Sequence, residues 1–457
     1  MKFNALLRSI PVWIAVLAVS GVAVLLQSSR EEVADGATPA PADFAAVGIE
    51  DELIGKLVVA AAPTPLGSQL RGQFEHLSEG NLSQRLARAV LLGEIGSRED
   101  AVEAARAEVP TEEERAARGT ELRDALVAML EARAADGDAA AAVDADRRAL
   151  VESKLGYFAR VVEGAGVEEA ERTFAVLIGV FAWYALMFVA GTASLIAMAV
   201  LLGTGRMKAA LVPAAEPRTV VILGETFLVW FVGFLALTVS ARLVAGAEAS
   251  EEAMLALGAL AMFLSLGALA YPVLRGVSFA ELRRHIGLHA GAGMLREVVA
   301  GVHCYVSAVP LLAVGLVIFA ILSAISTAVF GEQPQPSHPA VEMIGGSTAL
   351  RVVLLYLLAS VAAPIVEEIA FRGLFYGHLR GAVGPNERVF SAIVAAVFTS
   401  FVFAVIHPQG VLFVPALGGL AIGFCLFREW RGSLVAPIVA HGVNNAVTMT
   451  IGLLLLS

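Results

Sequence analysis

The amino-acid sequence predicts an all-α fold, a polytopic transmembrane helix bundle of about nine spans with a small helical extramembrane domain inserted after the first span. Hydrophobic residues make up 58% of the 457 residues and charged residues only 16%. Soluble domains, in contrast, are about half apolar and a quarter charged. The mean hydropathy is +0.76. Apolar runs of about 17 to 25 residues, long enough to cross a bilayer, recur along the chain, and one long polar segment interrupts them.

The first apolar run extends from Ile10 to Leu26 and follows Lys2 and Arg8. A basic start before an apolar run is typical of a signal anchor or of a cleaved signal peptide. The run is longer than the usual apolar region of a signal peptide, and no clean small-x-small cleavage site follows it closely. We therefore interpret residues 1–27 as a signal anchor, which is the first transmembrane helix.

The polar segment, residues 28–172, carries the acidity of the chain. It holds 16 Lys and Arg against 29 Asp and Glu, whereas the net charge of the whole chain is −10. Nucleic-acid binding needs a basic footprint, so this balance argues against it. Stretches such as Asn81–Val109 and Thr111–Ala134 are rich in Ala, Glu, Arg and Leu, which are strong helix formers. We expect a small helical domain here that binds a substrate or a protein partner.

Eight further apolar runs follow, of which the earlier ones lie in residues 173–348 and the later ones in residues 349–457. The short loops between them alternate between loops with basic residues and loops that lack Lys and Arg. Basic loops favour the cytoplasmic side, so we expect the N-terminus inside and residues 28–172 outside. The Ala and Arg usage and the leader indicate a bacterial cytoplasmic membrane. The runs are Phe174–Leu202, Thr219–Ala245, Ala253–Leu274, Val298–Phe330, Ala349–Tyr376, Val389–His407, Val411–Phe427 and Leu434–Leu456.

Two adjacent glutamates, Glu367 and Glu368, lie inside the run Ala349–Tyr376. An ionisable group within a span costs roughly 2.5 to 3.5 kcal/mol, so such a group is a candidate for function and usually has a partner. Glu368 and Arg372 are four residues apart on a helix and can neutralise one another. Glu367 points about 100° away from that pair. A carboxylate in a poorly hydrated cavity suits a general base that takes a proton from water.

Two histidines and an asparagine follow on the later runs. His407 comes four residues after Phe403, and His441 and Asn445 share one face of the last helix. With the glutamates, these groups provide a base, a partner or metal ligand, and donors that can stabilise an oxyanion. An ion-pair cluster that only fixes helix packing would account for the glutamates, but the later histidines favour catalysis.

The ordered pattern Glu-Glu-x-x-x-Arg, Phe-x-x-x-His and His-x-x-x-Asn resembles the CPBP family of intramembrane peptidases, which covers CAAX prenyl endopeptidases and bacteriocin-processing (ABI) proteins. The resemblance extends over Ala349–Ser457, which it implies is the catalytic core. By that similarity Glu367 and His407 activate water, and His441 and Asn445 stabilise the oxyanion. Glu368 and Arg372 are then the structural support of the site.

Metal dependence stays open at this point. CPBP proteins are often described as metalloproteases, yet the same residues support a metal-free glutamate mechanism. Glu367, His407 and His441 are three candidate ligands that leave one open position on zinc. The chain lacks a His-Glu-x-x-His motif. Zinc is thus the one cofactor that the residues suggest.

The resemblance predicts an intramembrane endopeptidase that hydrolyses a peptide bond of a membrane-bound protein or peptide in the lipid bilayer. The alternative is a non-catalytic membrane protein, either a transporter or a scaffold whose outer domain binds a partner. A transporter would show an internal inverted repeat and paired breaks in its helices. We find no convincing repeat in the sequence.

Helix counting places Glu367 and His407 at opposite membrane depths. About 18 residues of straight helix rise roughly 27 Å, which would put Glu367 near the cytoplasmic end of its span and His407 near the far end of the next. We therefore expect the glutamate-bearing helix to be long or tilted, or the segment Gly377–Glu387 to re-enter the protein. A separation above about 10 Å would contradict catalysis, because a general base must reach its water.

Overall fold

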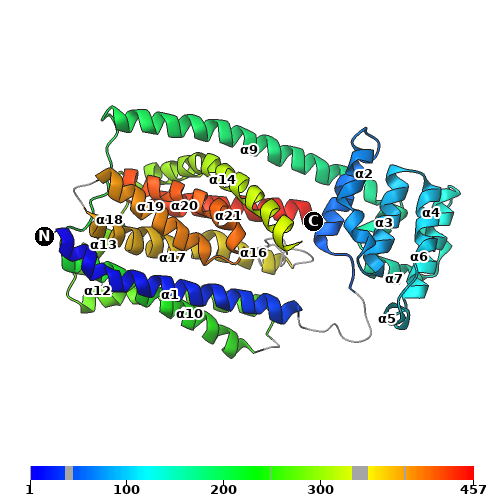
Figure 1. The fold of residues 1–457 in the computed structure, drawn as a ribbon, viewed down its shortest axis with the longest axis horizontal. Coiled ribbons are helices and arrows are strands. Elements are labelled where there is room, and N and C mark those ends of the chain that lie inside the picture. Colours follow the sequence, from blue (N-terminus) through cyan, green and yellow to red (C-terminus); the bar gives the residue numbers. More distant parts are fainter. Residues whose placement is uncertain (1, 36–44, 247–248, 332–347, 385–387, 457) are drawn as a thin grey trace. The chain divides into compact units, whose positions relative to one another are not determined.

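The computed structural model describes residues 2–35, 45–246, 249–331, 348–384 and 388–456 (Figure 1). Within these ranges the secondary structure is helical and contains no strand, which confirms the predicted all-α class. The chain forms two compact units. The membrane unit comprises Met1–Glu31 and Trp183–Gly452, and the polar unit comprises Glu32–Ala182 and Leu453–Ser457.

The polar unit is a set of short helices around its own apolar core, in which Phe74, Leu86, Leu126 and Tyr157 are fully buried. Three of the helices begin with a reciprocal capping box, a side-chain arrangement that satisfies backbone N–H groups at a helix start. The helices are α2 (Ile49–Ala61), α3 (Leu82–Ile95, capped by Asn81), α4 (Arg98–Ala107, capped by Ser97), α5 (Glu112–Ala116, capped by Thr111), α6 (Gly119–Ala134), α7 (Ala145–Leu155), α8 (Tyr157–Val162) and the start of α9 (Gly166–Gly203).

Glu114 ties α5 to α3 in this unit. Its carboxylate accepts hydrogen bonds from the Leu82 N–H at 2.7 Å and from the Arg85 guanidinium at 3.0 Å. The Thr111 N–H donates to it as well, at 2.8 Å. Burial by itself raises the pKa of Glu114, but the hydrogen bonds from Thr111, Arg85 and Leu82 outweigh burial and hold that pKa below its ordinary value.

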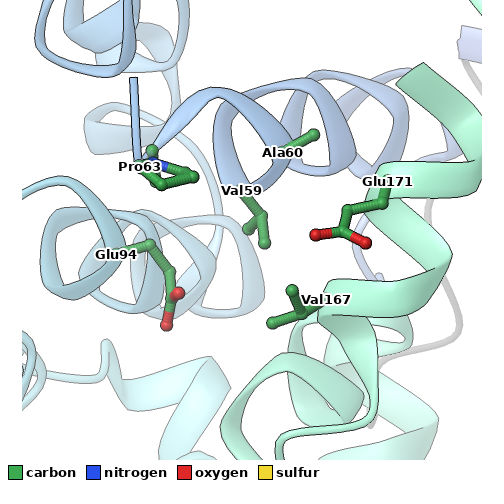
Figure 2. A pocket seen from close by; sticks show the side chains of 7 residues that line it. Val59, Ala60, Pro63, Glu94, Val167 and Glu171 are labelled. Atoms are coloured by element: carbon green, nitrogen blue, oxygen red, sulfur yellow. The ribbon is translucent and has the colours of Figure 1, made fainter. Parts of the chain in front are cut away.

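A shallow hollow of about 270 Å³ lies on the surface of the polar unit. Figure 2 shows Val59 and Val167 between the side chains of Glu94 and Glu171. The Glu94 carboxylate is paired with Arg133 at 2.5 Å. The hollow presents no nucleophile beside a base, so we do not interpret it as a catalytic site.

In its described residues, the membrane unit contains eight helices that are long and apolar enough to cross a bilayer, together with one shorter apolar helix, Val389–Val405. The expected number of about nine therefore corresponds to eight spans and one short helix in the described residues. The helices are α1 (Lys2–Asp35), α9, α10 (Pro217–Ala245), α11 (Glu251–Ser265) continued by η4 (Leu266–Leu269) and α12 (Ala270–Leu274), α14 (Met294–Phe330), the stretch Ala349–Val383, α19 (Arg388–Val405), α20 (Val414–Arg431) and α21 (Val435–Leu456).

The stretch Ala349–Val383 is 35 residues long and consists of alternating α-helical and π-helical pieces. Glu367 lies midway along it, so the prediction of a long glutamate-bearing helix is confirmed. Residues 377–383 continue the same helix, and residues 385–387 of the segment expected to re-enter lie outside the described residues. The pieces are α16 (Ala349–Leu357), the π-helical η5 (Leu358–Ala362), α17 (Ala363–Glu368), the π-helical η6 (Ile369–Phe375) and α18 (Tyr376–Val383).

Close helix contacts in the membrane unit depend on glycine. A Cβ atom on Gly315 of α14 would lie 2.2 Å from the Pro415 carbonyl oxygen, and one on Gly419 of α20 would lie 2.3 Å from the Leu311 carbonyl oxygen. Neither position has room for a larger residue, so both glycines let the backbones of α14 and α20 approach. Small residues serve the same purpose in membrane helices generally.

The first helix packs into the same core as the glutamate-bearing stretch. Val12 and Val16 of α1 are buried in that core. The Trp13 Nε1–H donates to Nε2 of His378 at 2.8 Å, and Nδ1 of His378 donates to the Val220 carbonyl of α10 at 2.7 Å. His378 is fully buried, and both of its ring nitrogens are hydrogen-bonded. It therefore links α1, α10 and α18.

Candidate active site

The glutamate pair lies on α17, between the two π-helical pieces of its stretch. A π-helical turn inserts an extra residue into the helix, and such turns are frequent at functional sites. Here they flank Glu367 and Glu368 on both sides. Glu368 is completely buried, whereas the side chain of Glu367 keeps 17% of its surface exposed.

Glu368 is the centre of a buried hydrogen-bond network. Its Oε1 atom accepts from Nη1 of Arg372 at 2.8 Å, as the four-residue spacing predicts. The same oxygen also accepts from Nδ1 of His441 at 2.9 Å. The sequence did not indicate this second bond. Glu368 therefore orients a histidine of the site in addition to neutralising Arg372.

Glu367 faces both histidines. Its Oε2 atom lies 3.9 Å from Nε2 of His407 and 3.9 Å from Nε2 of His441. That oxygen is buried and has no hydrogen-bond partner among the described residues. The separation from His407 is far below the limit of about 10 Å that catalysis sets. The expected convergence of these two groups is thus present.

His407 reaches the level of Glu367 because the glutamate-bearing stretch continues past Glu367 to Val383, and α19 then runs back over a similar length. The helix ends at Val405, and the chain turns through residues 406–413 before α20 begins. Nδ1 of His407 donates to the Phe403 carbonyl at 2.5 Å, which satisfies one of the unpaired carbonyls at the end of α19. This bond fixes the ring tautomer and leaves Nε2 as the nitrogen that faces Glu367.

Asn445 is held by the π-helical turn that precedes the glutamates. Its Nδ2 donates to the Ala359 carbonyl of η5 at 2.7 Å, and its Oδ1 accepts from Asn444 at 3.2 Å. A Cβ atom on Gly442 would lie 2.6 Å from the Ser360 carbonyl oxygen, so α21 approaches η5 closely at this point. Asn445 is thus fixed against η5 on the helix that carries His441.

Two aromatic rings enclose the charged groups. Phe403 lies 4.3 Å from the His407 ring, and Phe424 stacks on His441 with centroids 5.5 Å apart. The Arg372 guanidinium lies 4.6 Å from the Phe403 ring centre and 5.2 Å from that of Phe424. Aromatic faces attract a desolvated cation, which helps to keep Arg372 buried.

The structure brings together five of the six residues that the sequence singled out, and the sixth, Asn445, lies one helical turn after His441 on α21. Sequence reasoning missed Phe424 and the Ala359 carbonyl. It quoted Phe403 in the motif Phe-x-x-x-His but assigned it no role, although its four-residue spacing from His407 signals contact on a helix. No comparable sequence signal exists for Phe424, which belongs to a different helix.

The three candidate zinc ligands do not form a tight cluster. Within the described residues, no group of three or more His, Cys, Asp or Glu side chains is arranged to hold a metal ion. Zinc binds nitrogen and oxygen at about 2.0 to 2.2 Å, which places neighbouring ligand atoms about 3.4 Å apart in a tetrahedral site. Both imidazole nitrogens lie 3.9 Å from Glu367 Oε2. This arrangement does not fit zinc, and metal dependence stays an untested prediction.

The comparisons with known proteins cover this same region. Residues 349–447 match the family model of type II CAAX prenyl endopeptidase Rce1-like proteins, a range that contains every residue of the site. This region is therefore similar to the CPBP family. The eight candidate spans agree with a membrane protease family, and the chain is an integral membrane protein.

A curated relative matches part of the chain. Over 135 residues the chain is 28% identical to the membrane-embedded CAAX protease MroQ of Staphylococcus aureus (strain USA300). The match covers 29% of this chain and 52% of that protein, so the chain spans about half the length of this relative. The search of solved structures found no match.

Proposed function

We propose that this chain is an intramembrane endopeptidase that hydrolyses a peptide bond of a membrane-associated protein. The observation that carries the proposal is the buried, unpartnered Glu367 Oε2 between two imidazole nitrogens, each 3.9 Å away. A gap above 3.5 Å between polar atoms is the distance that a bridging water spans. The match of residues 349–447 to the CAAX prenyl endopeptidase family model supports the same chemistry.

Glu367 and His407 activate the hydrolytic water in this proposal. The Nδ1–H of His407 is committed to the Phe403 carbonyl, so its Nε2 has a lone pair that can accept a proton. Water placed between Nε2 and Glu367 Oε2 loses a proton to this pair as its oxygen attacks the substrate carbonyl carbon. The pair then delivers that proton to the leaving amine, and the C–N bond breaks.

His441 and Asn445 stabilise the tetrahedral oxyanion. Nδ1 of His441 already donates to Glu368, so the ring donates from Nε2 as well only when it is an imidazolium. The ring lies between two carboxylates, with Glu368 Oε1 2.9 Å from Nδ1 and Glu367 Oε2 3.9 Å from Nε2. A carboxamide has two N–H groups, and Asn445 uses one of them on Ala359, which leaves the second for the oxyanion.

Glu368 and Arg372 act as positioning residues. Through its hydrogen bond, Glu368 sets the ring orientation and the protonated Nδ1 of His441. Arg372 compensates the Glu368 charge, which would otherwise be buried alone. The support that the sequence predicted for this pair thus extends to His441.

Comparison of membrane proteomes from a wild-type strain and a Glu367→Gln strain tests the proposal. Glutamine keeps the shape of the side chain but accepts no proton from water. At least one membrane protein is expected to accumulate uncleaved in the variant, and purified wild-type protein is expected to cleave it in detergent. A scaffold or transporter would give identical cleavage patterns in the two strains, and that result would sink the proposal.

A further inference from the structure

The segment between α12 and α14 joins two membrane spans and therefore lies at a bilayer surface. The preceding span ends at Leu274 and the next begins at Met294. Within the segment, α13 (Phe279–Ile286) is a short amphipathic helix that starts with a Ser278 cap and ends at Gly287. Gly287 has φ +82°, a left-handed conformation that glycine adopts readily at a helix end.

The inner face of α13 packs on the glutamate-bearing stretch. Leu282 and Ile286 are buried, and the Ile286 side chain lies against Gly373 of η6. Arg428 fixes the end of α13, because its guanidinium donates to the His285 carbonyl at 3.1 Å and to the Arg372 carbonyl at 3.3 Å. The helix is therefore held rigidly beside the candidate active site.

The remaining faces of this segment combine exposed arginines with exposed apolar side chains. Arg283, Arg284 and Arg296 are exposed and form no ion pair with a described residue. Phe279 is 58% exposed and Leu295 is 77% exposed. Phe279 and Arg283 are four residues apart and share a side of α13. We call these five residues the interfacial surface.

We propose that the interfacial surface binds the headgroups of anionic phospholipids. Guanidinium groups match the geometry of phosphate oxygens. Exposed apolar side chains at the ends of two spans belong at the boundary between headgroups and acyl chains, and their burial there adds to the affinity for lipid. An acidic protein that binds from water would not bury these side chains in the bilayer, so the combination favours lipid over such a partner. Basic residues in the last turn of α13 would also stabilise the helix by interacting with its dipole. That explanation accounts for the arginines but not for the exposed side chains of Phe279 and Leu295.

Titration of the purified full-length protein in detergent tests this proposal. The probes are dioctanoyl phosphatidylglycerol and, as the neutral reference, dioctanoyl phosphatidylcholine. Each basic residue near an anionic surface contributes about five-fold in affinity, so Arg283→Gln with Arg284→Gln is expected to weaken phosphatidylglycerol binding about 25-fold. Binding of phosphatidylcholine is expected to stay within two-fold. Because both arginines are exposed, the variant is expected to keep the wild-type melting temperature.

Two further variants keep the proposal falsifiable. Arg206→Gln with Lys208→Gln removes two charges from another basic loop and is expected to leave phosphatidylglycerol binding within two-fold. Arg283→Lys with Arg284→Lys keeps the charge and is expected to recover most of the affinity. Equal binding of the two lipids by wild type would overturn the proposal, as would an equal loss in the Arg206/Lys208 variant. Displacement of phosphatidylglycerol by poly-glutamate at equal charge would indicate an acidic protein partner instead.

Discussion

Replacement of Glu368 by glutamine separates a positioning role from a purely structural one. Glu368 Oε1 accepts from Arg372 and from His441, while Oε2 has no partner among the described residues. Glutamine can therefore keep both hydrogen bonds through its carbonyl oxygen and lose only the charge. The matched control is Glu297→Gln, because Glu297 is equally buried and pairs with Arg431 at 2.6 Å outside the candidate site.

The two substitutions are expected to destabilise the protein by similar amounts. Each leaves a buried or half-buried arginine without its counter-charge, a change that costs about 3 to 5 kcal/mol when the pair is fully desolvated. Arg372 is 0% exposed and Arg431 is 17% exposed, so the loss at Glu297→Gln is expected at the lower end of that range. Thermal unfolding of the purified proteins in detergent measures both losses.

Only Glu368→Gln is expected to impair cleavage. Without the charged acceptor, the hydrogen bond that orients the His441 ring is weaker, and Nε2 is less well placed as the oxyanion donor. Removal of one oxyanion donor typically lowers kcat about 10²- to 10³-fold. The assay is the rate of cleavage per folded molecule, with the substrate identified from the Glu367→Gln strain. Glu297→Gln is expected to stay within two-fold of wild type.

The reasoning about His441 is refuted if folded Glu368→Gln cleaves at the wild-type rate. It is equally refuted if the Glu368 and Glu297 variants lose the same activity per folded molecule, because a general loss of packing would then explain both. A reduced KM with unchanged kcat in Glu368→Gln would also contradict it, since an oxyanion donor acts in the transition state.

Three further predictions concern the metal, the polar unit and the first helix. Treatment with 1,10-phenanthroline is expected to leave cleavage unchanged, and stoichiometric zinc in the purified protein with zinc-dependent activity would contradict the metal-free mechanism. The pKa of Glu114 is lowered in the folded state, so its contribution to stability is present above the ordinary value of 4.5 and is lost as the pH falls through the folded value. The hydrogen-exchange protection factors of residues 82–130, which are corrected for the intrinsic exchange rate at each pH, are expected to fall below pH 4.5 in wild type and less steeply in Glu114→Gln. Trp13→Phe removes the donor to the buried His378 and is expected to cost about 1 to 3 kcal/mol in thermal unfolding, and an unchanged midpoint would argue against α1 as a packed part of the membrane unit.

Much of the fold follows from the sequence because membrane helices are recognisable as long apolar runs. The length of each apolar run identified the spans. In hydrocarbon, only helices and closed barrels satisfy all of their backbone hydrogen bonds, so a long apolar run is expected to form a helix. The same rule failed for α19, where the run Val389–His407 looked like a full span. Its helix stops at Val405, and the glutamate-bearing stretch continues to Val383, beyond the predicted end at Tyr376, so His407 lies beside Glu367.

The site was predictable where partners share a helix and unpredictable where they do not. Glu368 and Arg372 are four residues apart, so their contact follows from helix geometry. The bonds from His441 to Glu368 and from Asn445 to Ala359 join separate helices, and they depend on π-helical turns that have no clear sequence signature. Hydrogen bonds of this kind are decided by tertiary packing.

The most direct test of the central claim is single-turnover cleavage by purified Glu367→Gln compared with wild type and Glu297→Gln. A general base contributes about 10²- to 10⁴-fold, so the Glu367 variant is expected to fall by at least 10²-fold while it still binds the substrate and unfolds at the wild-type temperature. Glu297→Gln is expected to cleave at nearly the wild-type rate. Cleavage by folded Glu367→Gln at more than a tenth of the wild-type rate would contradict the assignment of Glu367 as the base that activates water.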